Sequence, residues 1–321
     1  MTLTRLIGEP APTLRDSDGL TDDHPLRLTS SARYSVILRA LVFLAAFVAA
    51  LMLFSSIQFA IQGNFAIYGS STPLWQLLAA ILAYGLLAFL MEGRVWPHEI
   101  APKRLLGLPK GLVVGFVLIS VCVGVLAALG MYRVAAVHGN YNPWMDLFVA
   151  GVVAAISEEI LFRGVLFRLV EEWVGTWGAV GISALVFGFM HLSNDNGSIW
   201  GAVAIAIQAG VLLAAVYVVT RSLWWCIGLH FAWNITEGPL WGAAVSGNTM
   251  SDSWLVPSWS GPDILTGGTF GLEGSILPVV LCGVVGVGLL VWAARHGYIV
   301  APMWVRKKQA ASTDEGSTKT D

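Results

Sequence analysis

The sequence is short of charge. Only 12% of its 321 residues are charged, against about 25% in a typical soluble domain, and 56% are hydrophobic. So few charged groups cannot cover a water-facing surface, which excludes an ordinary soluble domain. A net charge of −2 also leaves no basic excess of the kind that nucleic-acid-binding proteins carry. We therefore expect no nucleic-acid partner.

The sequence also has few cysteines and no nucleotide-binding loop. The three cysteines, Cys122, Cys226 and Cys282, are scattered over apolar segments, so we predict neither a disulfide framework nor a cysteine-based metal site. There is no Walker-type or dinucleotide-binding loop, and we expect no nucleotide. A Gly-x-Ser-x-Gly elbow and a His-Glu-x-x-His helix are absent from the apolar segments. Covalent serine catalysis therefore has no support.

The sequence is instead rich in long apolar runs, with a mean hydropathy of +0.72. A run of about 20 such residues is long enough to cross a bilayer as a helix. The sequence predicts an all-α fold, a polytopic membrane helix bundle in contact with the lipid bilayer. We expect about eight transmembrane helices, near residues 36–60, 74–92, 111–131, 144–167, 177–193, 199–220, 223–243 and 275–295.

Lysine and arginine are concentrated in every second connection. They flank the first span, fill the 93–110 connection and follow the fourth, sixth and eighth spans, whereas the intervening connections contain only Arg133. Positive charge marks the cytoplasmic side of membrane proteins, so we predict that both termini are cytoplasmic. Because no organelle-targeting signal is apparent, we expect a bacterial plasma (inner) membrane protein.

A charged side chain in mid-bilayer costs about 2.5–3.5 kcal/mol, yet the fourth predicted span contains Glu158-Glu159-Ile-Leu-Phe-Arg163. Glu159 and Arg163 are four residues apart, which favours an intrahelical ion pair. Glu158 lies about 100° away around the helix and faces elsewhere. The surplus carboxylate could act as a base or an acid, and the alternative is a purely structural charge network.

Two histidine motifs lie in later spans. Phe187-Gly-Phe-Met-His191 ends the fifth span, and His230-Phe-Ala-Trp-Asn234 lies in the seventh, with Glu237 on the same helical stripe. A lone histidine at a helix end is more often structural than functional. Two imidazoles, an amide and a carboxylate on three helices are, however, what the activation of water requires.

Depth along the bundle constrains the fifth helix. If straight helices rise about 1.5 Å per residue from the cytoplasmic side, a helix starting at Trp177 places His191 too deep to meet Glu158 and His230. We therefore expect residues 165–173 to lie along the interface and the fifth helix to begin near Gly181.

The three motifs, complete and in this order, resemble those of the CAAX prenyl endopeptidase and bacteriocin-processing family of intramembrane proteases, also called CPBP or ABI. The pattern is Glu-Glu-x-x-x-Arg, then Phe-x-x-x-His, then His-x-x-x-Asn. The resemblance covers residues 143–243. It implies that Glu158, His191, His230 and Asn234 are catalytic and that Glu159 and Arg163 support them.

The resemblance also leaves the role of metal open. His191 and His230 could bind Zn²⁺ or another divalent metal, or could position water directly, with Glu158 as the base. We divide the chain accordingly into a polar cytoplasmic tail (1–34), N-terminal transmembrane helices (35–142), the CPBP protease core (143–243), an external loop (244–274), the last transmembrane helix (275–296) and a cytoplasmic tail (297–321).

The leading hypothesis is an intramembrane endopeptidase that cleaves a membrane-associated or lipid-modified peptide or protein. One alternative is a non-catalytic membrane scaffold or immunity-type protein, in which the polar cluster holds the helices in register. Another is a transporter that uses Glu158 and the histidines as a proton relay. The sequence shows no internal repeat of the kind found in many transporters.

Overall fold

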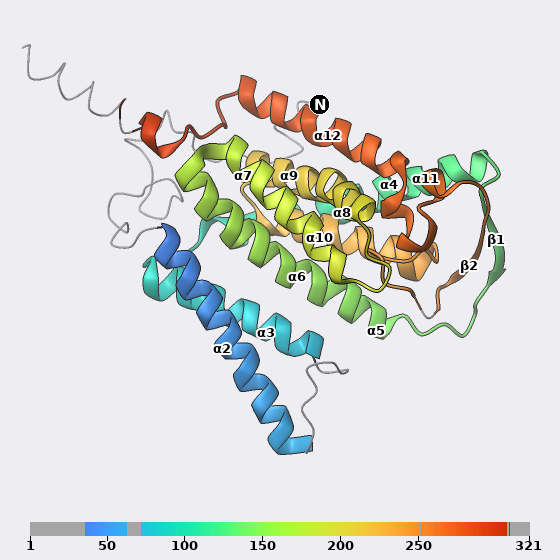
Figure 1. The fold of residues 1–321 in the computed structure, drawn as a ribbon, viewed down its shortest axis with the longest axis horizontal. Helices are drawn as coiled ribbons and strands as arrows, with labels where there is room; N and C mark the ends of the chain where they lie inside the picture. Colours follow the sequence, from blue (N-terminus) through green and yellow to red (C-terminus); the bar gives the residue numbers. More distant parts are fainter. Residues whose placement is uncertain (1–35, 63–71, 95, 251, 307, 309–321) are drawn as a thin grey trace, which may run out of the picture.

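The computed structural model describes residues 36–62, 72–94, 96–250, 252–306 and 308. The predicted tail at 1–34 and the end of the predicted tail at 297–321 lie outside this part of the chain. Helices dominate the described residues (Figure 1). The first elements are α2 (Val36–Gln62), α3 (Thr72–Gly85), the π-helix η2 (Leu86–Met91), the 3₁₀ turns η3 (His98–Ile100) and η4 (Pro102–Arg104), α4 (Gly107–Ala128) and the strand β1 (Tyr132–Val137).

The middle of the chain alternates α-helical and π-helical segments. In order these are α5 (Trp144–Asp146), η5 (Leu147–Val153), α6 (Ala154–Glu159), η6 (Ile160–Phe167), α7 (Arg168–Met190), the 3₁₀ turn η7 (His191–Ser193), α8 (Ile199–Ile205), η8 (Ala206–Val211), α9 (Leu212–Thr220), α10 (Leu223–Ile235) and η9 (Thr236–Leu240). The last elements are β2 (Leu255–Trp259), α11 (Asp263–Thr266), the 3₁₀ turns η10 (Gly268–Phe270) and η11 (Leu272–Gly274), and α12 (Ile276–Arg295).

Five helices in the described part of the chain are long and apolar enough to cross a membrane. They are Val36–Ala60, Pro73–Met91, Pro102–Ala128, Ile199–Thr220 and Ile276–Arg295. The protein is thus a polytopic helical membrane protein, and five of the eight predicted spans are confirmed by length and composition. The other three carry the polar motifs. The fourth confirmed span is 78% buried and forms the centre of the bundle, whereas α2 lies at its edge (Figure 1).

The prediction of a purely α-helical fold was wrong at one place. Strands β1 and β2 form an antiparallel two-stranded sheet that joins the two connections predicted as loops, with Tyr132 opposite Trp259. The rings of these residues pack edge to face, 4.7 Å apart. Aromatic cross-strand pairs stabilise a sheet, and β-branched and aromatic residues in both segments favour strands.

The expected start of the fifth helix near Gly181 was also wrong. Helix α7 runs from Arg168 to Met190 and is kinked at Gly175, where φ is 79°. A Cβ at Gly175 would lie 2.7 Å from the carbonyl oxygen of Val300. Glycine is therefore required here both by the lack of space for a side chain and by the positive φ. The second half of α7 therefore begins at Thr176, whose backbone N–H donates to the same carbonyl at 3.0 Å.

Four of the arginines that mark the predicted cytoplasmic side, Arg39, Arg94, Arg168 and Arg221, are buried and paired. Arg39 binds Glu92 at 3.0 Å and also pairs with Glu172, and Arg168 binds Glu92 at 2.8 Å. Other pairs extend this network to further segments: Arg94 with Glu99, Arg221 with Glu171, and Arg306 with the carbonyl of Glu172. These arginines therefore gather at one end of the bundle, and the side of the membrane that this end faces stays a prediction.

Glu99 shows how such pairing acts on a buried acid in the 93–110 connection. Burial alone would raise the pKa of this carboxyl, but the guanidinium groups of Arg94 and Arg168 and the hydroxyl of Tyr84 lower it to about 2. A depressed pKa means that Glu99 stabilises the fold above its ordinary pKa, and that this stabilisation is lost as pH falls towards about 2.

Helices α4 and α10 approach each other backbone to backbone. Gly107, Gly111 and Gly115 are spaced four residues apart and form one stripe on α4. A Cβ at Gly111 would lie 2.3 Å from the carbonyl oxygen of Trp225, and one at Gly115 would lie 2.3 Å from that of Leu229. Only glycine permits this contact, which fixes the position of α10 in the bundle.

Changing Gly111 to alanine is expected to destabilise the protein by about 1–3 kcal/mol, because the added methyl group must push α4 away from α10. The matched control is Gly124→Ala on the same helix, where nothing lies within 4 Å of the added atom. Thermal unfolding of the two purified variants in the same detergent checks this expectation. Equal midpoints would mean that the close contact is unimportant.

Candidate active site

The residues of the three motifs are carried by neighbouring helices. Glu158 and Glu159 end α6, and Arg163 lies in the π-helix η6 that follows. His191 begins the turn η7 directly after α7, and His230 and Asn234 lie one turn apart on α10. Helix α10 packs against both η5 and α6, which brings the first and third motifs together.

Glu159 lies between a guanidinium and an imidazole. Its Oε1 accepts a hydrogen bond from Nη1 of Arg163 at 2.9 Å, which confirms the predicted intrahelical pair. The same oxygen is 3.0 Å from Nδ1 of His230. Both Glu159 and Arg163 are fully buried. Glu159 therefore fixes the orientation of the His230 ring relative to α6.

Arg163 ties this pair to two further helices. Its Nη2 donates to the carbonyl oxygens of Ala209 and Gly210, both at 3.3 Å, in the π-helix η8. Its guanidinium also lies 4.8 Å from the centre of the Phe187 ring on α7. Arg163 thus joins η6, η8 and α7.

The hydrogen bond to Glu159 also determines which face of His230 is free. A carboxylate only accepts hydrogen bonds, so Nδ1 of His230 carries the hydrogen and Nε2 of the neutral ring has a lone pair. This Nε2 is 3.9 Å from Oε2 of Glu158, too far for a direct hydrogen bond. That oxygen of Glu158 is buried and lacks a hydrogen-bond partner within the described chain.

His191 is oriented by its own helix. Its Nδ1 is 2.7 Å from the carbonyl oxygen of Phe187, so Nδ1 donates and Nε2 is again the free nitrogen. The Phe187 ring lies between the two imidazoles, with its centre 5.0 Å from that of His191 and 6.1 Å from that of His230. The motif phenylalanine is therefore a packing partner of both histidines, a role that the sequence did not reveal.

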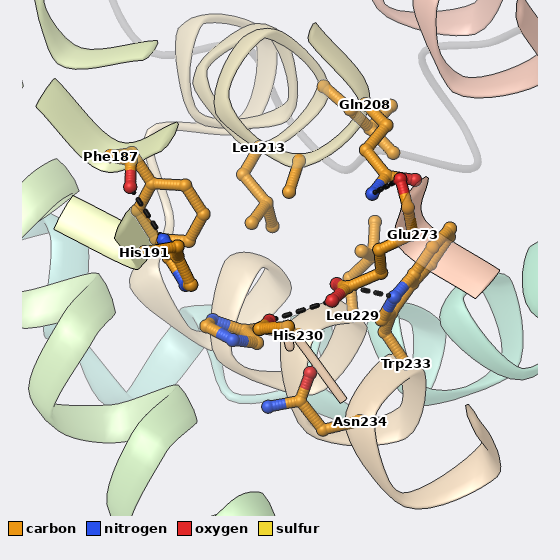
Figure 2. A pocket seen from close by; sticks show the side chains of 12 residues that line it. Phe187, His191, Gln208, Leu213, Leu229, His230, Trp233, Asn234 and Glu273 are labelled. Carbon is orange, nitrogen blue, oxygen red and sulfur yellow. Dashed lines mark hydrogen bonds between the residues drawn. The ribbon is translucent and has the colours of Figure 1, made fainter. Parts of the chain in front are cut away.

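His191, His230 and Asn234 line one cavity of about 20 Å³, room for about one water molecule (Figure 2). The amide nitrogen of Asn234 donates to the carbonyl oxygen of Ala150 at 2.8 Å, which leaves its second N–H free. Glu158 does not line this cavity but reaches it through His230. The structure thus brings three of the four residues predicted to be catalytic to one cavity and places the fourth, Glu158, beside His230.

The donor set falls short of a catalytic metal site. Such zinc sites use three protein ligands, and no three His, Cys, Asp or Glu side chains in the described chain are arranged to hold a metal ion. His191 and His230 supply two imidazole nitrogens. The predicted metal therefore has no matching ligand set in this arrangement, and we derive no step through it.

The opposite wall of the cavity contains polar residues that the motifs did not identify. Gln208 and Glu273 lie there beside Trp233 (Figure 2), and Ser246 also lines the cavity. Glu237 shares a helical stripe with His230 in the sequence, but it contacts Trp233 and Glu273 instead. The contact between Trp233 and Glu237 could have been predicted from the sequence, because residues four apart can meet on a helix.

Comparison with protein families agrees with this geometry. Residues 140–236 match the model of a family described as type II CAAX prenyl endopeptidase Rce1-like. The matched residues include all three motifs, from Glu158 to Asn234, which confirms the resemblance inferred from them. Searches of curated proteins and of solved structures gave no match.

Proposed function

The chain carries a type II CAAX prenyl endopeptidase Rce1-like domain, from a family of proteases, over residues 140–236. On this premise we propose that it is an intramembrane endopeptidase in which Glu158 and His230 activate a water molecule. The observation that supports this proposal is the pair of facing acceptors, Oε2 of Glu158 and Nε2 of His230, 3.9 Å apart and without a hydrogen bond between them.

The spacing of these acceptors suits one water molecule. A water oxygen about 2.8 Å from both atoms would see them at an angle of roughly 90°, close to the angle between its two O–H bonds. Water there donates one hydrogen to Glu158 and the other to His230. Its lone pairs then point away from both residues, towards a substrate carbonyl.

Glu158 is the general base in this proposal. It takes a proton from the water as the oxygen attacks the carbonyl carbon, and it returns the proton to the leaving amine. Glu159 holds Nδ1 of His230, so that Nε2 stays an acceptor for the water. Arg163 holds Glu159 in place through the 2.9 Å ion pair.

Asn234 is proposed to bind the oxyanion that forms at the scissile carbonyl. The Ala150 carbonyl holds one N–H of its amide, and the other can donate to the developing negative charge. His191, on the same cavity wall, orients the carbonyl group. We propose a membrane-associated or lipid-modified peptide or protein as the substrate, since the domain belongs to a membrane protease family.

The test compares protein termini in membranes that contain either the wild-type chain or Glu158→Gln at equal abundance. A protease generates new termini only with the wild type, because glutamine cannot accept the proton. Asp195→Asn is the matched control, since it makes the same change at an exposed site. Identical termini in all three samples would contradict the proposal and favour the scaffold hypothesis.

A further inference from the structure

The carboxyl groups of Glu237 and Glu273 meet at a single donor. Nε1 of Trp233 lies 3.0 Å from Oε1 of Glu273 (Figure 2) and 3.0 Å from Oε2 of Glu237, so one indole N–H serves both acids. Glu237 is fully buried and Glu273 is 3% exposed. Glu237 comes from η9, whereas Glu273 ends the segment 244–274.

The other donors to this pair are neutral. The backbone N–H of Glu273 donates to Oε1 of Glu237 at 3.1 Å, and the hydroxyl of Ser246 donates to Oε2 of Glu273 at 2.7 Å. None of the ion pairs in the described chain includes either acid. Two thiols, Cys122 on α4 and Cys282 on α12, also interact electrostatically with the pair, Cys122 with Glu237 and Cys282 with Glu273.

Two unpaired carboxylates in a dry site repel each other strongly and lose their hydration. The histidines of the cavity form no ion pair with these two acids in the described chain: His230 pairs with Glu158 and Glu159, and Nδ1 of His191 is directed to the carbonyl of Phe187. The arrangement is stable when one proton is shared between the acids, as in other carboxyl pairs that occupy one site.

Glu273 also attaches its segment to the bundle. Its carbonyl oxygen accepts a hydrogen bond from Nε2 of Gln208 at 2.9 Å, in addition to the contacts of its side chain with Trp233 and Ser246. The two ends of the segment also touch, since a Cβ at Gly271 would lie 2.0 Å from the carbonyl oxygen of Ala244. These two ends contribute Ser246 and Glu273 to the cavity wall.

We propose that segment 244–274 is a lid over the His191–His230 cavity, held closed by one proton shared between Glu237 and Glu273. Loss of this proton at high pH leaves two carboxylates on one indole N–H, and their repulsion detaches Glu273 from η9. A second proton at low pH creates no repulsion, so the lid opens only on the alkaline side. This inference concerns access to the cavity and holds whether or not the chain cleaves peptides.

Hydrogen–deuterium exchange of the full-length protein in lipid nanodiscs tests the proposal. After correction for the intrinsic effect of pH, protection of peptides covering 244–250 and 267–274 should fall at least ~10-fold between about pH 6 and about pH 10, because two like charges buried at one site repel by several RT. In Glu273→Gln the amide mimics the protonated acid, so protection should stay constant. Asp263→Asn, an exposed change in the same segment, should behave like the wild type.

A second variant and a direct probe cover the case in which Glu273→Gln does not fold. Glu237→Gln should also remove the pH dependence, because the remaining acid has no neighbour to repel. Infrared spectra at neutral pH should show a protonated carboxyl band in the wild type that either substitution removes. A lid that opens equally in the wild type and both variants, or a band that both variants keep, would overturn the proposal.

Discussion

Replacing Glu158 with glutamine is expected to lower kcat/KM for peptide cleavage by ~10²–10⁴-fold, the usual contribution of a general base. The fold should survive, because the side chain of Glu158 is 24% exposed and makes no ion pair with Arg163. Glutamine keeps the shape of the side chain and can still accept a hydrogen bond from water, but it cannot take up the proton.

The measurement uses purified protein and a peptide identified from the comparison of termini. Thermal unfolding of the same preparations shows whether the variant is folded. Asp195→Asn should keep both its activity and its midpoint. If Glu158→Gln cleaved the peptide at the wild-type rate, Glu158 would not be the base.

The neighbouring substitution, Glu159→Gln, should lower stability as well, by about 3–5 kcal/mol. It removes the carboxylate partner of Arg163 and leaves a guanidinium charge in a site with no exposed surface. Most of this loss of stability comes from the unpaired guanidinium charge of Arg163, so removing both partners should restore part of it. We therefore expect the double variant Glu159→Gln/Arg163→Met to be more stable than Glu159→Gln alone.

Unfolding in a denaturing detergent, monitored by circular dichroism, compares these proteins with Glu158→Gln as the matched control. The adjacent glutamates should then differ in their effect on stability: Glu158→Gln keeps the fold, and Glu159→Gln weakens it. Equal losses of stability in Glu158→Gln and Glu159→Gln would contradict the division of roles between the two acids.

Local spacing was sufficient to predict part of the site. The pairing of Glu159 with Arg163 follows from four residues on one helix, and the structure has it at 2.9 Å. The contact between Glu159 and His230 depends on how α6 crosses α10, which no local pattern specifies. The motifs predicted which residues belong to the site, whereas their geometry required the packing of the bundle.

Glu237 shows a different limit of prediction from the sequence. Its position relative to His230 and Asn234 predicts one common stripe, provided that the α-helix continues. The chain changes to a π-helix at Thr236, and the wider turn rotates the following residues. Glu237 is thus directed towards Glu273, which lies 36 residues further along the chain. Neither the change of helix type nor so distant a partner is encoded in a short pattern.

Other differences between the predicted and the observed fold arise from contacts between segments that are distant in the sequence. Strands β1 and β2 pair although more than a hundred residues separate their sequences. The kink at Gly175 depends on Val300, which approaches from beyond α12. The glycine repeat at Gly107, Gly111 and Gly115 is a different case, because its spacing was visible in the sequence and its packing role could have been predicted.

That repeat has a consequence for how the sequence can change in length. Where side chains separate two helices, an inserted residue can be absorbed by new rotamers, but contacting backbones have no such freedom. One residue inserted between Gly107 and Gly115 would rotate the stripe by about 100° and shift it by about 1.5 Å. Insertions in the connections should be tolerated far better. The number of residues in this part of α4 therefore determines where α10 places His230, although none of its side chains lines the cavity.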